Sequence, residues 1–237
     1  MDTVLITGAT SGIGLALAKR YLADGARVII AGRNSEKLER TVTDNPGMIP
    51  LLTDVSMESE RLTLFETVRD TYPDVNILIN NAGIQQRLDV ADMDWEVWKK
   101  EIDTNFAAPI HLCGLFVPLL KGKEHAVIVN VTSGLGFFPM APTPVYCATK
   151  AGLHSFTYTL REQLKGSGIE VIEIIPPSVD TNLGGPGVHS GATDVDEFTD
   201  SVYSELIKGE EEIGYGFTKQ FAGRTAAQRQ SMRRKDG

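Results

Sequence analysis

The chain of 237 residues is long enough for one domain with a sizeable core, and its 42% hydrophobic and 23% charged content is ordinary for a globular protein. The net charge of −8 argues against nucleic acid as a main partner, and we expect neither a membrane-spanning run nor a signal peptide. Because only two cysteines occur, no disulfide framework is implied, and we expect a cytoplasmic protein.

Short apolar runs alternate with helical patterns along the chain. The runs predict buried parallel strands at 3–7, 27–31, 48–54, 76–80, 126–132 and 170–175. The helical patterns lie at 13–25, 35–42, 58–72, 94–120 and 145–168. This alternation predicts an α/β fold, a doubly wound parallel sheet (Rossmann fold) with helices on both faces in three layers. We expect one domain over 1–237, in which 182–210 forms a substrate lid and 224–237 a polar tail.

The first motif, TGATSGIG, lies between the first predicted strand and the first helix. Gly8, Gly12 and Gly14 let the chain turn tightly and bring backbone amides against a pyrophosphate, and the helix N-terminus adds its positive dipole end. Three glycines alone are more often only a turn. Their place in this strand and helix pattern favours a dinucleotide site.

The end of the second strand indicates which dinucleotide is bound. An acidic residue at this point would bind the ribose 2′-hydroxyl of NAD, whereas an arginine accommodates the 2′-phosphate of NADP. The sequence IIAGRNS has no acid there but has Arg33, with Asn34 and Ser35 as further donors. Arg33 could instead be the first solvated residue of a helix, but the missing acid favours NADP(H).

A tyrosine and a lysine stand one helical turn apart in PTPVYCATK. Pro142 and Pro144 exclude a helix before them, so we expect the helix to begin near Val145. Tyr146 and Lys150 then share one face of that helix.

Asn105 is a poor helix former inside the predicted helix 94–120. Pro109, four residues later, has no amide to donate to the Asn105 carbonyl. We therefore expect this carbonyl to be free and the helix to be kinked nearby.

Five motifs occur in an order that resembles the short-chain dehydrogenase/reductase family: TGATSGIG, NNAG at 80–83, VTS ending at Ser133, YCATK, and IIPPSVDT. The resemblance runs over nearly the whole chain. Around and between these motifs the sequence is similar to that of the DltE-type bacterial oxidoreductases. The resemblance implies that Tyr146 is the general acid or base and that Ser133 binds the substrate oxygen. It also implies that Lys150 lowers the pKa of the phenol from ~10, and that the Asn105 carbonyl holds a water serving Lys150.

The resemblance further implies the residues that bind the cofactor. They are Gly8, Thr10, Ser11, Gly12, Ile13, Gly14, Arg33, Asn34, Asp54, Val55, Asn81, Ala82, Gly83, Tyr146, Lys150, Pro176, Val179 and Thr181. Asp54 would meet the adenine, although it could also cap a helix. One departure is Pro177, which stands where the family has glycine and removes a backbone amide from this loop.

These features predict an NADP(H)-dependent carbonyl reductase or alcohol dehydrogenase (EC 1.1.1.-). A dehydratase or epimerase on the same scaffold, or an NADP(H) sensor without turnover, are the alternatives. Leu135, Phe137, Phe138, Met140 and Val145 predict a largely apolar substrate pocket, to which residues 85–87 could add polarity. We expect no metal, because the four histidines lack ligand spacing. By family analogy we expect a homodimer or homotetramer.

Overall fold

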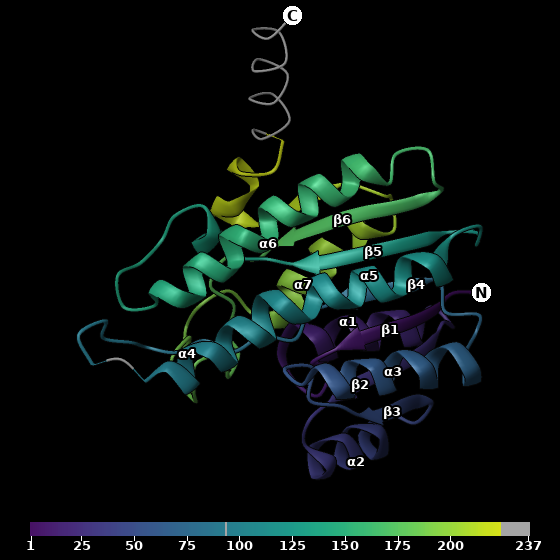
Figure 1. Cartoon of the computed structure of the whole chain (residues 1–237), viewed down its shortest axis with the longest axis horizontal. Helices are drawn as coiled ribbons and strands as arrows, with labels where there is room; N and C mark the ends of the chain where they lie inside the picture. Colours follow the sequence, from purple (N-terminus) through teal and green to yellow (C-terminus); the bar gives the residue numbers. More distant parts are fainter. Residues whose placement is uncertain (93, 224–237) are drawn as a thin grey trace, which may run out of the picture.

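A computed structural model describes residues 1–92 and 94–223, so the predicted polar tail lies outside the described residues. Within the described part, parallel strands form one sheet in the order β3-β2-β1-β4-β5-β6-β7 (Figure 1). Their bounds are β1 Thr3–Thr7, β2 Arg27–Gly32, β3 Met48–Leu52, β4 Ile77–Asn80, β5 Ala126–Val131, β6 Ile169–Ile175 and β7 Glu212–Gly214. The doubly wound prediction is confirmed, and the strand order reverses between β1 and β4. A crevice at such a reversal is where open α/β sheets bind ligands.

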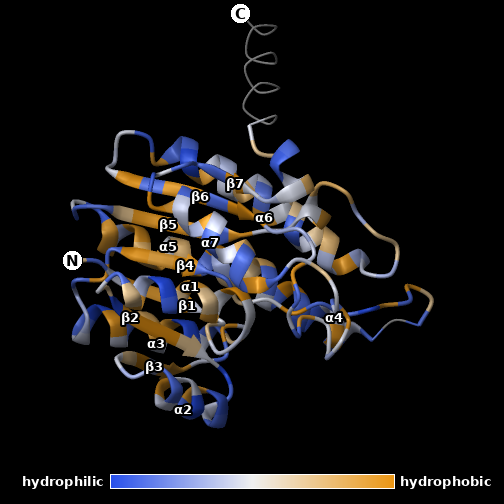
Figure 2. Ribbon diagram, turned by 180° about the vertical axis from the view of Figure 1, so that it is seen from behind, coloured by the Kyte–Doolittle hydropathy of each residue, from blue (hydrophilic) through white to orange (hydrophobic). Residues whose placement is uncertain are grey.

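Helices cover both faces of the sheet. Their bounds are α1 Gly12–Ala23, α2 Ser35–Asp44, α3 Glu58–Thr71, α4 Trp95–Ile102, α5 Ala108–Leu120, α6 Pro144–Gln163 and α7 Val195–Leu206. Successive side chains of a strand point to opposite faces, which produces two cores. Val4 and Ile6 pack toward α1 and α7, whereas Leu5 packs toward α3, α5 and α6. In Figure 2 the strands form a hydrophobic layer between the helices.

Two expectations about particular segments change. The helical run Trp95–Leu120 is, by length and composition, long and apolar enough to cross a membrane, whereas we had expected no run of that kind. In the fold, however, its Leu112, Phe116 and Leu120 are fully buried against the sheet. The predicted lid 182–210 is too long, because Phe198 and Val202 of α7 belong to the core. A lid stays a prediction for the loop 182–193.

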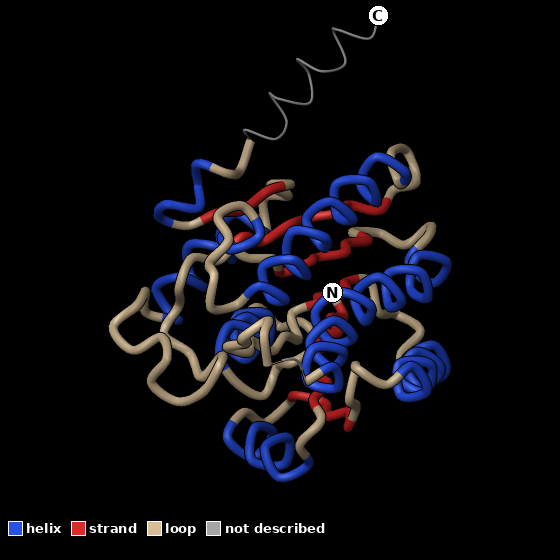
Figure 3. The backbone as a smooth tube through the Cα atoms, turned by 60° about the vertical axis from the view of Figure 1, so that its left-hand side comes forward, coloured by secondary structure: helices blue, strands red, loops and turns tan. Residues whose placement is uncertain are grey.

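The loops at the carboxyl ends of the strands gather at one end of the sheet (Figure 3). They include the glycine turn after β1, the loop after β4 and the long connection after β6. Residues far apart in the sequence therefore meet at this edge.

Candidate active site

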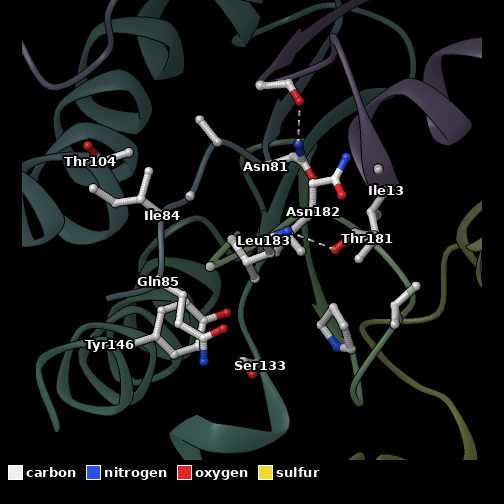
Figure 4. A pocket seen from close by; sticks show the side chains of 18 of the residues that line it. Ile13, Asn81, Ile84, Gln85, Thr104, Ser133, Tyr146, Thr181, Asn182 and Leu183 are labelled. Carbon is white, nitrogen blue, oxygen red and sulfur yellow. Dashed lines mark hydrogen bonds between the residues drawn. The ribbon is translucent and has the colours of Figure 1, made fainter. Parts of the chain in front are cut away.

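A cavity of about 620 Å³ opens at the carboxyl ends of the strands. Its walls come from the segments that follow each of the strands β1 to β7, and Figure 4 shows Tyr146, Ser133 and Gln85 on one side and Thr181 and Ile13 on another. The residues predicted for the cofactor lie together here with two exceptions, Asn34 and Gly14, which are not in the lining.

The glycine turn fits an anion-binding cradle. Gly8 and Gly12 have φ of +66° and +55°, which L side chains rarely adopt. A Cβ atom on Gly8 would lie 2.7 Å from the Cα atom of Ala82, so the two loops touch backbone to backbone. Helix α1 begins here, and its N-cap Ser11 makes no side-chain cap hydrogen bond. The amides of the first turn are thus left to bind a pyrophosphate.

Asn81 fastens the glycine turn to the end of β4. Its Nδ2 atom donates to the carbonyl oxygens of Thr7 at 2.9 Å and Gly8 at 3.2 Å. The backbone amides of Asn81 and Ala82 both donate to the Thr7 hydroxyl at 3.1 Å. The point where the strand order reverses is therefore held by hydrogen bonds rather than by packing alone.

Cations mark the far end of the cavity, beyond the glycine turn. Arg33 and Lys37 both line it, whereas Asn34 caps α2 by accepting the amide hydrogen of Lys37 at 2.8 Å. The carboxylate of Asp54 also lines this end. Burial opposes its ionisation, but hydrogen bonds from Ser56 and the nearby cations outweigh burial and lower the pKa of Asp54.

Tyr146, Lys150 and Ser133 meet at the other end of the cavity. Helix α6 begins at Pro144, close to the predicted start. Tyr146 is buried and lines the cavity together with Ser133, which follows β5. The Lys150 Nζ atom donates to the Val131 carbonyl at 2.8 Å and lies 5.7 Å from the centre of the Tyr146 ring.

The ionisation of this group differs from the expectation in one respect. Burial raises the pKa of Tyr146 to about 12, although its hydrogen bond with Ser133 opposes the rise. The pKa of Tyr146 in the protein alone is thus raised, and its lowering by Lys150 stays a prediction. Burial also lowers the pKa of Lys150 to about 8.

The helix around Asn105, where a kink was expected, departs from α geometry. Residues Asp103–Ala107 form a π-helical turn, in which the Ala108 amide donates to the Asp103 carbonyl five residues earlier. The Asn105 side chain holds the loop after β4, donating to the Ile84 carbonyl at 2.7 Å and accepting from the Ile84 amide at 2.9 Å. The free backbone carbonyl of Asn105 stays a prediction.

The loop after β6 closes the cavity beside the glycine turn. The Pro176 carbonyl accepts the Gly134 amide at 2.9 Å, which joins this loop to the segment carrying Ser133. A Cβ atom on Gly12 would lie 3.2 Å from the Thr181 methyl group. Val179 is buried and pairs with Thr193.

The apolar residues predicted after Ser133 divide into two groups. Leu135 and Met140 line the cavity. Phe137 instead stacks on Phe221, and Phe138 is 72% exposed, because the short 3-10 turn Gly134–Gly136 directs them away. Val145 is absent from the lining as well.

Several lining residues have no signal in the sequence. Lys37 lies one turn into α2, Thr104 follows α4, and Phe217 comes from the far end of the chain. Leu183 and Val188 of the loop 182–193 also line the cavity. Among the described residues, no group of three or more His, Cys, Asp or Glu side chains is placed to hold a metal ion.

A doubly wound sheet with a glycine cradle at its reversal point defines a dinucleotide-binding protein. The profile of the short chain dehydrogenase family matches residues 2–189, and the chain belongs to that family of oxidoreductases. It is 50% identical over 184 residues to the uncharacterized oxidoreductase DltE of Bacillus subtilis, covering 77% of this chain and 73% of the relative.

Two solved structures share the fold. A short-chain dehydrogenase from Sphingobium yanoikuyae in complex with NADPH has a TM-score of 0.86 and 26% identity, covering 98% of this chain and 96% of its own. A Burkholderia phymatum family member in complex with NAD has a TM-score of 0.82 and 22% identity, covering 90% and 88%. The same fold thus binds either cofactor.

Proposed function

We propose that this protein reduces a ketone or aldehyde to an alcohol with NADP(H), using Tyr146 as the general acid. The observation that supports this most is that the buried Tyr146 lines the cavity together with Ser133 and Lys150, whose Nζ atom lies 5.7 Å from the centre of the Tyr146 ring. When bound, NADPH supplies the hydride that reduces the carbonyl carbon.

The protein's own part is to place and protonate the substrate oxygen. Ser133 donates a hydrogen bond to that oxygen and holds it beside the phenol. Tyr146 transfers its proton to the oxygen as negative charge develops there. The ammonium group of Lys150 stabilises the resulting phenolate. Asn105 keeps the loop after β4 in place through its two hydrogen bonds to Ile84.

The pKa of Tyr146 supports the reductive direction. Since burial raises that pKa to about 12, the phenol keeps its proton at neutral pH and is available as an acid. Oxidation of an alcohol would need the phenolate, which the protein alone disfavours.

A preference for NADP(H) rests on charge at the end of β2. Arg33 and Lys37 line the cavity, and no carboxylate follows β2 directly to repel a 2′-phosphate. Gly8, Thr10, Ser11, Gly12, Ile13, Asn81, Ala82, Gly83, Pro176, Val179 and Thr181 would hold the rest of the dinucleotide.

The substrate we propose is largely apolar with one polar or anionic end. Leu135, Met140, Leu183 and Phe217 supply the apolar wall. Arg87 lines the same region, because the Leu88 amide beside it donates to the Pro142 carbonyl near the start of α6. Arg33 and Lys37 are assigned to the cofactor phosphate and Lys150 to the catalytic group. Arg87 is therefore the lysine or arginine of the lining that is left to bind an anionic group of the substrate.

A panel of ketones and aldehydes, with and without carboxylate groups, tests this function. We expect wild-type protein to oxidise NADPH with at least one of them and Tyr146→Phe to do so far more slowly. NADPH binding without turnover on any substrate would instead favour the sensor. We also propose that the chain forms one domain, that it assembles into a homodimer or homotetramer, and that it is cytoplasmic. Sedimentation tests the oligomeric state, and cell fractionation tests the location.

A further inference from the structure

A carboxyl group that the proposed chemistry does not use lies buried beside the catalytic end of the cavity. Glu101 of α4 is 0% exposed. Its Oε1 atom accepts the Gln86 backbone amide at 3.1 Å. Its Oε2 atom is one of two buried side-chain nitrogen or oxygen atoms, among the described residues, that make no hydrogen bond. A buried carboxyl group with one oxygen lacking a hydrogen-bond partner raises the free energy of the folded protein. A nearby positive charge would offset part of this cost.

The position of Glu101 connects it to the residues around Lys150. Glu101 precedes Asn105 by four residues, and both side chains bind the loop after β4, at Gln86 and Ile84. Gly83, the residue before Ile84 in that loop, lies next to both Asn105 and Lys150. A Cβ atom there would be 3.5 Å from the Asn105 Oδ1 atom and 3.7 Å from the Lys150 Nζ atom.

The charges in this buried group act on one another. The charges of Lys150 and Glu101 act on each other, and the charges of Glu101 and Cys147 both act on Tyr146. Burial raises the pKa of Glu101 to about 7, and Lys150 opposes that rise. Burial lowers the pKa of Lys150 to about 8, and Glu101 opposes that fall. The attraction acts across space, since the Oε2 atom touches no donor.

We propose that Glu101 is a positioning residue for proton transfer, whose carboxylate keeps Lys150 in the ammonium form behind Tyr146. This role rests on the proposed function. When Tyr146 gives its proton to the substrate oxygen, the phenolate draws on the positive charge of Lys150. If Lys150 passes a proton to the phenolate, the phenol is restored and a neutral amine remains. The carboxylate then favours the return of a proton from solvent to that amine.

Glu101→Gln tests the role, because the amide oxygen can still accept the Gln86 amide while the charge is lost. We expect the alkaline limb of the kcat/KM profile to move about one pH unit lower, because the Glu101 charge favours the ammonium form of Lys150 and its loss lowers the pKa of that lysine. Asp103→Asn is the matched control, because it removes a partly exposed carboxylate paired with Lys99 from the next turn. An alkaline limb that stays in place in Glu101→Gln overturns the proposal.

A second measurement needs no turnover and therefore separates this inference from the proposed function. In protein labelled with ¹³Cε-lysine, with the resonance assigned through Lys150→Arg, Lys150 should titrate at a lower pH in Glu101→Gln than in wild type. In wild type the same resonance should show a second inflection as Glu101 titrates. If neither occurs, the inference fails even when a ketone is reduced. If both occur without any turnover, only the proposed function fails.

Discussion

Adding one methyl group at Gly14 tests the cradle at its tightest point. Gly14 lies in the first turn of α1 with an ordinary helical φ, so backbone strain plays no part. A Cβ atom there would lie 2.6 Å from the Gly8 carbonyl oxygen and still closer to the Asn81 Nδ2 atom. Neither neighbour can move freely, because that Nδ2 atom is itself bonded to the Thr7 and Gly8 carbonyls.

The magnitude follows from two opposing effects of Gly14→Ala. Overpacking at a rigid site costs about 1–3 kcal/mol, and the better helix propensity of alanine returns about 1 kcal/mol. The net cost is therefore up to about 2 kcal/mol, and since each kcal/mol changes the melting temperature of a domain of this size by about 2–4 °C, we expect a fall of up to about 8 °C. Because the cradle must shift, we also expect NADPH to bind at least about tenfold more weakly, which corresponds to about 1.4 kcal/mol.

Gly114→Ala is the matched control, because the same change in α5 meets nothing within 4 Å beyond its own helix. There the helix propensity acts alone, and we expect the melting temperature to rise by up to about 4 °C. Thermal unfolding followed by circular dichroism and fluorescence titration with NADPH measure both variants. Unchanged stability and unchanged NADPH binding in Gly14→Ala would refute the steric reasoning.

Four further outcomes follow from the site. Tyr146→Phe should lower kcat by about 10²–10⁴ with little change in NADPH affinity, and an active variant would remove Tyr146 from the mechanism. Arg33→Ala should weaken NADPH by about tenfold and leave NADH unchanged; equal effects on both would contradict a 2′-phosphate contact. Arg87→Ala should raise KM for carboxylate-bearing ketones by about tenfold but not for neutral ones, a difference that initial rates measure directly. Burial raises the pKa of Glu101 from its ordinary 4.5 to about 7, so its contribution to stability is present below pH 4.5 and is lost as the pH rises to 7. Urea unfolding of Glu101→Gln should therefore be less sensitive to pH in this window, and parallel curves would contradict the burial effect.

The chain itself determined the features that depend on near neighbours. The spacing of Tyr146 and Lys150 places them on one helical face whatever surrounds the helix, and Pro109 removes a helical hydrogen bond wherever the helix lies. The strand and helix alternation predicted the sheet in the same way, because each period reports which side of an element is buried. The range predicted for the lid includes α7, whose Phe198 and Val202 belong to the core, because the acidic sequence of this helix does not by itself reveal which face packs against the sheet.

The tertiary structure alone decided which distant groups share an environment. Residues from α4, from the loop after β4 and from α6 bring Glu101, Gly83 and Lys150 together, and no spacing in the chain joins them. The same holds for the raised pKa of Tyr146 and for Phe217 in the cavity wall. The physical reason is that a pKa depends on burial and on charges brought near by packing. Local sequence fixes a side chain's position on its own helix, whereas its dielectric surroundings belong to the whole fold.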